Sequence, residues 1–310
     1  MIKKTIQKIL FFYLVIITNA SALIEIDITE GNREPLPIAV TNFFYAEDAI
    51  KDLDQISIDV SKVISADLER SGLFKSIDQE AFIQKTASMH IRPRHEDWRL
   101  INAQALVTGE LEIDKDKLRV EFRLWDTFAE KEIEALVLIT TIDNWRRISH
   151  MIADKIYERL TGEEGYFDTR ILYVSENGPK NNRIKKLAIM DQDSFNHRYL
   201  TSGKELVLTP RFNPVKQEIT YLSYFKNLPR VYLLDIQTGI QEVVGDFPGM
   251  TFAPRFSPDG EKIIMSLARD GNSDIYVMDI KSRVVERLTD SPAIDTSPSY
   301  SPDGKKITFN

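Results

Sequence analysis

Histidines are the first residues to test for catalytic or metal-binding chemistry in this chain. There are four in 310 residues: His90, His95, His150 and His197. His90 and His95 lie five residues apart in an expected loop, a spacing that does not match the helical H-x-x-x-H zinc pair. His150 lies on an expected amphipathic helix and His197 in an expected turn, so both are interpreted as structural. The histidines therefore predict no metal site.

Carboxylates and candidate nucleophiles give no stronger indication of catalysis or metal binding. Asp191-Gln192-Asp193 begins like a calcium loop, but the glycine and the closing glutamate of that motif are missing. Glu163-Glu164 falls at an expected helix end and is interpreted as solvated. The chain contains no cysteine, no G-x-S-x-G nucleophile elbow and no glycine-rich phosphate loop. The sequence therefore predicts a protein that is not an enzyme and has no cofactor.

Composition and charge further limit the class of protein to which this chain can belong. The chain has 40 basic and 47 acidic residues, a formal net charge of -7, and is 43% hydrophobic and 28% charged. These proportions are typical of a folded soluble protein. The acidic balance argues against a dedicated nucleic-acid binder, and the length suggests about two domains.

The first twenty-two residues have the order of a secretory signal peptide. Three lysines near the start are followed by the apolar run Ile9–Ile17 and by the small residues Ala20-Ser21-Ala22. A run of nine is too short to span a bilayer, which takes about twenty residues. We therefore expect export, with cleavage after Ala22. Loss of the three lysines leaves 37 basic against 47 acidic side chains, a net charge of -10.

Residues 23–165 combine strand and helix patterns, as an α/β domain does. Leu23–Ile28 alternates apolar and acidic residues and predicts a half-exposed strand, and Ile38–Phe44 predicts a more buried one. Apolar residues at helical spacing predict two helices, which begin near residues 48 and 144 and end at Gly72 and Gly162. Three strand-like runs with hairpin-length connections lie between them: Ala105–Ile113, Leu118–Thr127 and Glu132–Ile142.

This region also carries the net negative charge of the chain. Residues 23–165 carry 18 basic and 29 acidic side chains, whereas residues 166–310 carry 19 and 18. Such a surface either attracts a basic partner segment or serves solubility alone.

Residues 166–310 contain a repeat with a period of 44 residues. Pro210-Arg211-Phe212 recurs as Pro254-Arg255-Phe256 and again as Pro298-Ser299-Tyr300. Turn signals and short β-type runs keep the same spacing, so each unit is predicted to form four antiparallel strands. That is the blade of a β-propeller. The first unit is four residues longer, and we expect the extra residues in the loop Asn177–Arg183.

Together these features resemble the TolB family. They are the exported start, the Ser-Pro-Asp-Gly blade repeats, and the segments Ile64–Phe74 (ISADLERSGLF) and Leu160–Val174 (LTGEEGYFDTRILYV). The resemblance implies an N-terminal α/β domain followed by a six-bladed all-β propeller. It also implies a non-catalytic periplasmic adaptor of the Tol-Pal system of Gram-negative bacteria, which supports outer-membrane integrity and constriction during cell division. Its implied partners are the lipoprotein Pal and the inner-membrane protein TolA, with other outer-membrane proteins as further candidates.

The resemblance also places two binding sites on this chain. TolA would bind the mature N-terminal segment, which consists of Leu23, Ile24, Glu25, Ile26, Asp27 and Ile28. The alternating pattern of this segment suits addition to a sheet edge, or docking on the protein itself. Pal would bind loops that precede the Pro-x-(Phe/Tyr) strands, with the candidates Met250, Phe252, Ala253, Asp295, Thr296 and Ser297. The alternative is that these six residues form ordinary blade loops.

Two other classes of propeller protein remain as alternatives. A peptidase of the prolyl-oligopeptidase type carries similar repeats, although it needs a hydrolase domain with a nucleophile elbow. A glycan-binding propeller would use exposed aromatic residues, and the sequence leaves open whether Tyr221, Tyr224 and Phe225 are exposed or belong to the core.

The predicted domains are a signal peptide over 1–22, an α/β domain over 23–165 and a partial propeller over 166–310. The last region holds about three and a quarter repeats, whereas a propeller closes with four to eight blades. We therefore expect a fragment that lacks on the order of 120 C-terminal residues.

Overall fold

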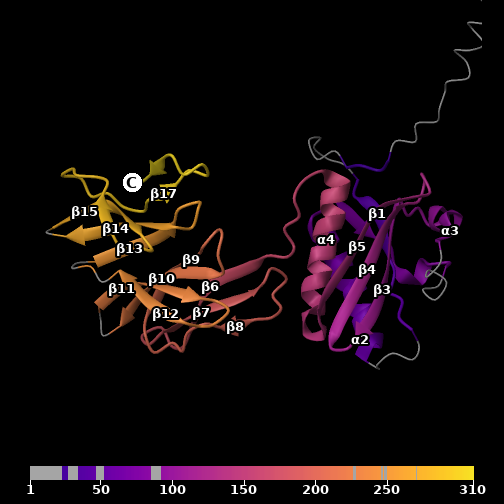
Figure 1. Ribbon diagram of the computed structural model, residues 1–310, viewed down its shortest axis with the longest axis horizontal. Coiled ribbons are helices and arrows are strands. Elements are labelled where there is room, and N and C mark those ends of the chain that lie inside the picture. The colour runs from indigo at the N-terminus through magenta and orange to yellow at the C-terminus, as the bar shows by residue number, and fades with distance from the viewer. Residues whose placement is uncertain are drawn as a thin grey trace, which may run out of the picture. The chain divides into compact units, whose positions relative to one another are not determined.

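A computed structural model of the chain describes residues 23–26, 34–46, 52–84, 92–225, 228–245, 247, 250–269 and 271–310. The chain divides into two compact units, residues 1–168 and 169–310 (Figure 1). The expected signal peptide, 1–22, and residues 27 and 28 of the expected first strand lie outside the described residues. None of the helices in the described part of the chain is long and apolar enough to cross a lipid bilayer.

A five-stranded mixed sheet forms the centre of the first unit, in the order β2-β1-β3-β4-β5. The strands are β1 (Leu36–Val40), β2 (Phe74–Ser76), β3 (Ala105–Asp114), β4 (Lys117–Asp126) and β5 (Lys131–Thr141). β1 pairs in parallel with β2 and β3, while β3, β4 and β5 form an antiparallel meander. The meander confirms the three predicted runs. β2 has only three residues, too few to show a period in the sequence.

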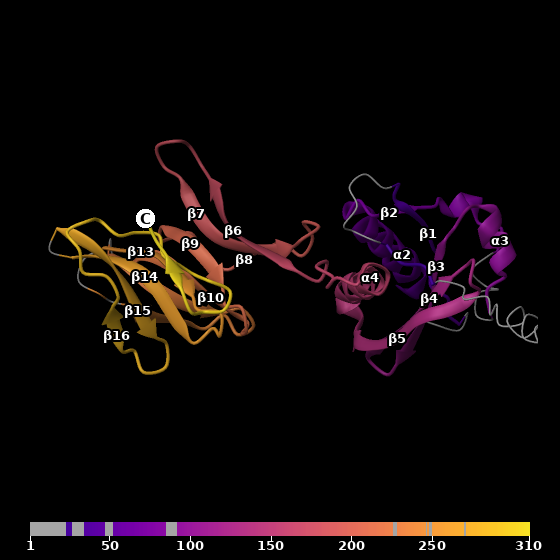
Figure 2. The ribbon, with the colours of Figure 1, turned by 90° about the horizontal axis from the view of Figure 1, so that it is seen from above.

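Helices α2 (Asp52–Arg70) and α4 (Trp145–Thr161) lie on one side of this sheet, and the short α3 (His95–Leu100) lies on the other (Figures 1 and 2). The two long helices were predicted, and each is followed by a glycine with a φ of 76°. Only glycine adopts this left-handed conformation without strain from a Cβ, so Gly72 and Gly162 end the helices. Two short 3-10 turns also lie in the first unit, η1 (Gln79–Ala81) and η3 (Ile142–Asn144).

Apolar side chains fill both faces of the sheet. The larger core lies between the sheet and the two long helices, and it includes Ile38, Val107, Phe122, Ile64 and Ile152, each fully buried. The smaller core contains Trp98 of α3, packed with Leu106 and Trp125. Burying a large apolar side chain contributes about 1.5–3 kcal/mol, so the two cores account for most of what holds this unit together.

Three sequence predictions need correction in this unit. The described residues of the predicted first strand, Leu23–Ile26, form no strand. The second predicted strand is shorter, Leu36–Val40, and Phe44 makes only an isolated bridge to Glu110. His95 was expected in a loop but begins α3. Segments of this length are decided by tertiary packing, which overrides local pattern.

The second unit consists of antiparallel sheets that follow one another along the chain. The first has three strands, β6 (Arg170–Asn177), β7 (Ile184–Asp191) and β8 (Arg198–Tyr199). Two four-stranded sheets follow: β9 (Val207–Phe212), β10 (Glu218–Phe225), β11 (Leu228–Asp235) and β12 (Gln241–Gly245), then β13 (Met250–Phe256), β14 (Lys262–Arg269), β15 (Asn272–Asp279) and β16 (Val285–Arg287). The last pair is β17 (Ser299–Tyr300) and β18 (Ile307–Thr308).

This arrangement confirms the predicted fold class, an α/β domain followed by propeller blades. It also places the irregularity of the first repeat where the sequence predicted it. Six residues, 178–183, connect β6 to β7, whereas two residues, 270 and 271, connect β14 to β15.

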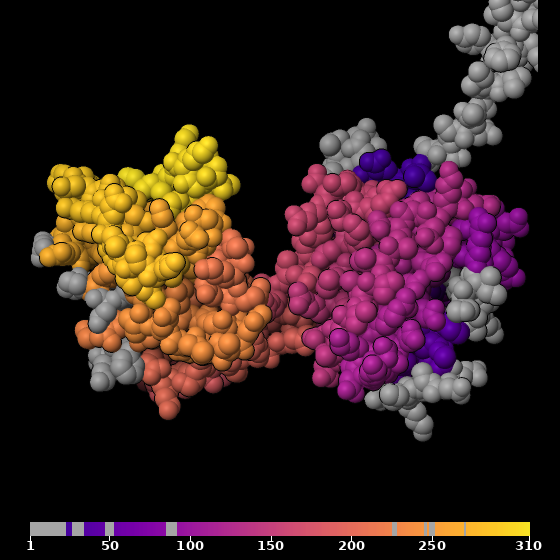
Figure 3. Space-filling model, in the orientation of Figure 1, coloured from indigo at the N-terminus to yellow at the C-terminus, as the bar shows by residue number. Residues whose placement is uncertain are grey.

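Successive blades pack against each other through shared cores. Val231 and Leu233 of β11 cluster with Ile263 and Met265 of β14, which belongs to the next blade. Figure 3 shows the blades as adjoining bands whose colours pass from orange to yellow with residue number. A polar contact joins the same two blades, because the Asn213 amide donates to the carbonyl of Gly260 at 3.0 Å. Neighbouring blades therefore stabilise each other, as expected of a repeat protein.

Candidate functional site

The N-terminal segment, residues 23–26, lies against the α/β domain and is held there mainly by backbone groups. The amide of Ile26 donates to the carbonyl oxygen of Leu160 at 2.6 Å. The amide of Ile24 donates to Oδ2 of Asp126 at 2.9 Å. Leu160 lies in the last turn of α4, where the final carbonyls have no partner within the helix. The segment thus supplies a donor to a helix end that needs one.

Alternate side chains of this segment point in opposite senses, as the sequence predicted, although no strand forms. Ile26 is 9% exposed and joins the main core, and Ile24 packs against that core. Leu23 and Glu25 are exposed. The side chains of the segment therefore alternate between inward and outward positions. Docking on the protein itself is the arrangement that the structure contains.

Asp126 is the polar residue on which this docking depends. It is 3% exposed and ends β4. Its Oδ1 accepts from the amides of Phe128 and Ala129, at 3.0 and 2.8 Å, which closes the turn between β4 and β5. Its Oδ2 accepts from Ile24. One buried carboxylate therefore holds a turn of the sheet and the N-terminal segment together.

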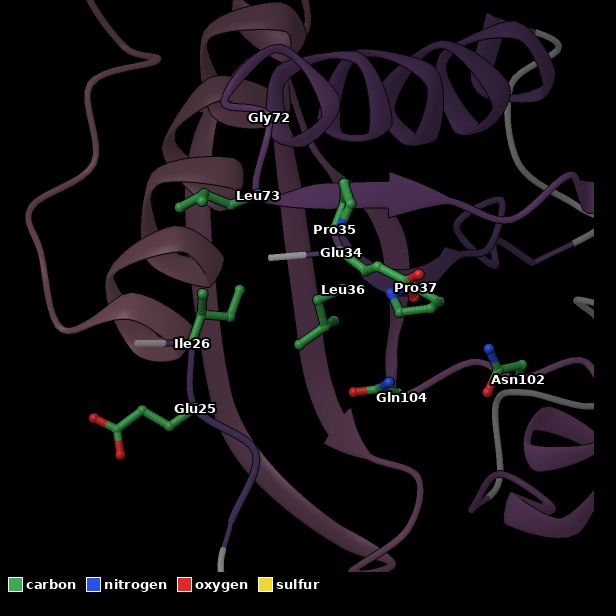
Figure 4. A pocket seen from close by; sticks show the side chains of 10 residues that line it. All are labelled: Glu25, Ile26, Glu34, Pro35, Leu36, Pro37, Gly72, Leu73, Asn102 and Gln104. Carbon is green, nitrogen blue, oxygen red and sulfur yellow. The ribbon is translucent and has the colours of Figure 1, made fainter. Parts of the chain in front are cut away.

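A cavity of about 220 Å³ lies beside the segment (Figure 4). Ile26, Leu36 and Leu73 line one side of it, and Asn102 and Gln104 lie on the other. The Glu25 carboxylate points away from the centre of this cavity in the figure. The cavity is thus part polar and part apolar, and it leaves one flank of the docked segment open.

Members of both groups of propeller residues predicted for Pal lie beside strands β14 and β15. Phe252 pairs with Ser266 in the sheet register, and the hydroxyl of the same Ser266 accepts from the amide of Ser297 at 3.2 Å. The backbone of Asp295 exchanges hydrogen bonds with Ser273 of β15. The structure therefore brings the two predicted groups, 250–253 and 295–297, to the same part of one blade.

One detail of that prediction was wrong. Met250, Phe252 and Ala253 lie inside strand β13, not in a loop before it. The strand begins early because its pairing with β14 continues through a register shift between Phe252 and Arg255. Asp295 is buried, at 6% exposure, so its side chain does not offer an open binding surface. Thr296 is half-buried and Ser297 is exposed.

A repeated backbone conformation marks this region, and sequence reasoning missed it. The residue before the blade proline has a positive φ in three successive repeats: Thr209 at 47°, Ala253 at 48° and Ser297 at 56°. These are rare conformations for residues with a Cβ, and a β-branched residue such as Thr209 is the least suited to them. Two of them coincide with a register shift, as in a β-bulge. The signal was present as an X-Pro pair every 44 residues.

The three histidines that the structure describes lie in structural positions, and His90 lies outside the described residues. His150 of α4 contacts Asp67 of α2, with 2.5 Å between Nδ1 and Oδ2, and both side chains are buried. His197 packs against the rings of Tyr173 and Tyr199. His95 is 5% exposed, and its ring nitrogens have no hydrogen-bond partner among the described residues. Burial lowers the pKa of His95, so it remains neutral at neutral pH.

The Asp191-Gln192-Asp193 segment, which only begins like a calcium loop, makes local turn contacts. Oδ2 of Asp191 accepts from the amide nitrogen of the Asn196 side chain, and Oδ1 of Asp193 accepts from the amide of Phe195. Both aspartates thus serve the turn between β7 and β8.

Fold and site define a two-domain protein, in which an α/β domain that carries a docked N-terminal segment precedes propeller blades. Two family profiles match the chain: "TolB amino-terminal domain" over residues 24–133 and "TolB beta propeller domain" over residues 157–310. The chain belongs to the TolB family.

Individual relatives agree with this assignment. The chain is 61% identical over 254 residues to the Tol-Pal system protein TolB of Pelagibacter ubique, and 56% identical over 234 residues to that of Paramagnetospirillum magneticum. A crystal structure of TolB from Acinetobacter baumannii matches with a TM-score of 0.76 and 30% identity over 89% of this chain. The chain spans 57% and 52% of the two curated relatives and 65% of the solved chain.

Proposed function

We propose that the protein acts as a non-catalytic periplasmic adaptor of the Tol-Pal system, which links Pal at the outer membrane to TolA from the inner membrane. In this role it supports outer-membrane integrity and constriction during cell division. The observation that carries the proposal is the N-terminal segment, 23–26, which is docked through two backbone donors and few side chains. The relatives of this chain that are named Tol-Pal system proteins support the same assignment.

The energetics of the segment suit a releasable contact. Its gains are the burial of Ile26, about 1.5–3 kcal/mol, the partial burial of Ile24, and two hydrogen bonds, about 1 kcal/mol for the neutral one and 1.5–3 kcal/mol for the one to a charged group. Fixing the backbone of the four residues opposes this by about 1–2 kcal/mol each. Gain and loss are similar in size. A partner that binds the free segment therefore competes with docking at a cost of a few kcal/mol at most.

We infer that the segment alternates between the docked state and a TolA-bound state. Deletion of residues 23–30 from the mature full-length protein should abolish TolA binding and leave Pal binding intact. Both affinities are measurable by surface plasmon resonance on immobilised partners. Equal loss of both partners would contradict the inference, because it would indicate a general folding defect.

The propeller surface that includes Phe252, Thr296 and Ser297 is the proposed Pal contact. Phe252 is the aromatic side chain of this group, and aromatic anchors commonly dominate an interface. Phe252→Ala should weaken Pal binding about tenfold or more. The matched control is Phe195→Ala, because Phe195 is 56% exposed on a turn of a different blade. Unchanged Pal binding by the Phe252 variant would overturn the proposal for this surface.

One capture experiment separates the adaptor from the alternative propeller functions. Full-length protein is used as bait in a bacterial envelope extract. Recovery of Pal supports the adaptor, whereas recovery of glycan alone supports a glycan-binding propeller. Release of product from a chromogenic prolyl peptide would support a peptidase.

A further inference from the structure

A second cavity lies in the propeller unit, across three consecutive blades. It has a volume of about 300 Å³ and is lined by the first strand of each blade and by the turn that follows it. Arg211 of β9, Arg255 of β13 and Ser299 of β17 occupy the same position of the repeat, 44 residues apart, and all three line the cavity. The repeat thus places two arginines and one serine in the lining of one cavity.

Among the described residues, the two arginines differ from three others of this unit that have acidic partners. Arg183, Arg283 and Arg287 form ion pairs with Glu176, Glu242 and Asp274. Neither Arg211 nor Arg255 pairs with a carboxylate among the residues that the structure describes. The one hydrogen bond of Arg211 in that part of the chain goes to the backbone carbonyl of Pro210, at 3.0 Å.

The Nε of Arg255 is buried and has no hydrogen-bond partner in the described part of the chain. Such groups are rare in folded proteins, because losing water without gaining a partner is costly. The two guanidinium groups also repel each other. Burial, and next the charge of Arg255, lower the pKa of Arg211. This cluster has excess positive charge and an unused donor.

We propose that this cavity binds an oxyanion, either a carboxylate or a phosphate, between Arg211 and Arg255. A guanidinium presents parallel N–H donors that match both groups, and an anion between two arginines removes their repulsion. Ser299 adds a neutral hydroxyl at the third position. Three aromatic residues, Phe212, Phe256 and Tyr300, also line the cavity, which suits an oxyanion on a short organic stem as well as a free ion. The proposal is independent of the adaptor role.

The test is a calorimetric titration of the full-length protein with inorganic phosphate, and separately with succinate, at neutral pH and low chloride. We expect saturable binding of at least one of the two anions, and the better ligand distinguishes the phosphate source from the carboxylate source. Arg255→Gln and Arg211→Gln should each weaken binding about tenfold or more, because each removes a charged donor. Arg283→Gln is the matched control, because it removes an arginine of the same unit that lies outside the cavity.

A thermal-shift measurement keeps the test decisive if a variant is unstable. The anion should raise the Tm of the wild-type protein and of Arg283→Gln, but not that of Arg255→Gln. Three results would overturn the proposal. They are no binding of either anion by the wild type, equal binding by all variants, and a crystal structure of the full-length protein in which one of its own carboxylates pairs with Arg255.

Discussion

The two units of this chain hold their candidate sites in different ways. In the α/β domain, a single buried carboxylate, Asp126, and a single helix carbonyl, that of Leu160, retain the N-terminal segment. In the propeller unit, the same features recur every 44 residues, among them the left-handed residue before each proline and the arginines of the cavity. A site built on single contacts is sensitive to one substitution. In a site built by repetition, one substitution alters one blade and leaves the equivalent contacts of the other blades in place.

The largest expected effect is on the buried pair that joins the long helices of the α/β domain. Asp67→Ala removes the partner of His150 and leaves a buried polar ring. Breaking such a pair costs about 3–5 kcal/mol. We therefore expect a loss of that size in the free energy of unfolding of the α/β domain, measured by urea denaturation. Asp54→Ala, at an exposed position of the same helix, is the control and should change this value by less than about 0.5 kcal/mol.

The corresponding test in the propeller is the bridge between blades. Asn213 donates to Gly260, and its Oδ1 accepts from the amides of Val215 and Lys216. Asn213→Ala should destabilise the unit by about 1–3 kcal/mol, because it leaves buried polar groups without partners. Lys216→Ala changes an exposed side chain of the same turn and serves as the control. A loss from Asn213→Ala as large as that from Asp67→Ala would contradict the comparison, since repetition should limit the damage.

A third substitution addresses the docked segment. Asp126→Asn keeps the size of the side chain and its acceptor toward the β4–β5 turn, but it turns an amide donor toward the amide of Ile24. The lost hydrogen bond to a charged group is worth about 1.5–3 kcal/mol. Faster hydrogen exchange at Ile24 and tighter binding of the proposed partner TolA are expected, because less of the segment is docked. Asp143→Asn, at an exposed position of the same unit, should change neither.

The smallest expected effects are those of pH on stability, and they also differ between the two units. His95 has a lowered pKa because it is buried, so its folded value lies below the unfolded value of 6.5. Its contribution is therefore complete above 6.5 and is lost as the pH falls through the folded pKa. The α/β domain should lose part of its stability just below neutral pH. His95→Gln should abolish that slope in unfolding measurements across the range.

The corresponding effect in the propeller comes from four aspartates and lies at lower pH. Hydrogen bonds from turn groups lower the pKa values of Asp235, Asp259, Asp279 and Asp303, which form two pairs spaced by 44 residues. The stability from these turns is complete above the unfolded value of 3.8 and is lost as the pH falls through the lowered folded values. A propeller that loses stability between pH 6.5 and 5 would contradict this difference between the units.

Local chemistry made much of the fold predictable. The two long helices, the β3–β4–β5 meander and the blade strands were predicted from periodicity, because a repeating apolar pattern requires one buried face. The blade turns were predicted from Ser-Pro-Asp-Gly, since proline and glycine restrict the backbone by themselves. The short elements β2 and α3 were not predicted, because three and six residues are too few for a period.

The candidate sites were predicted less completely. The alternation of residues 23–26 correctly separated inward from outward side chains, but it also suggested a strand that the described residues do not form. The six propeller residues were expected in loops, and three of them lie in β13. Strand ends depend on how far a neighbouring strand continues to pair, which the sequence of one strand does not contain.

By itself, the sequence determined the order of the elements, the 44-residue repeat and the glycine helix ends, all of which depend on residues close together in the chain. Tertiary structure alone decided that Ile24 meets Asp126, 102 residues away, and that Asp67 meets His150, 83 residues away. It also placed Arg211 and Arg255 on one cavity without a carboxylate partner in the described residues. Such contacts form because folding brings distant polar groups to the same buried place, where each must find a partner.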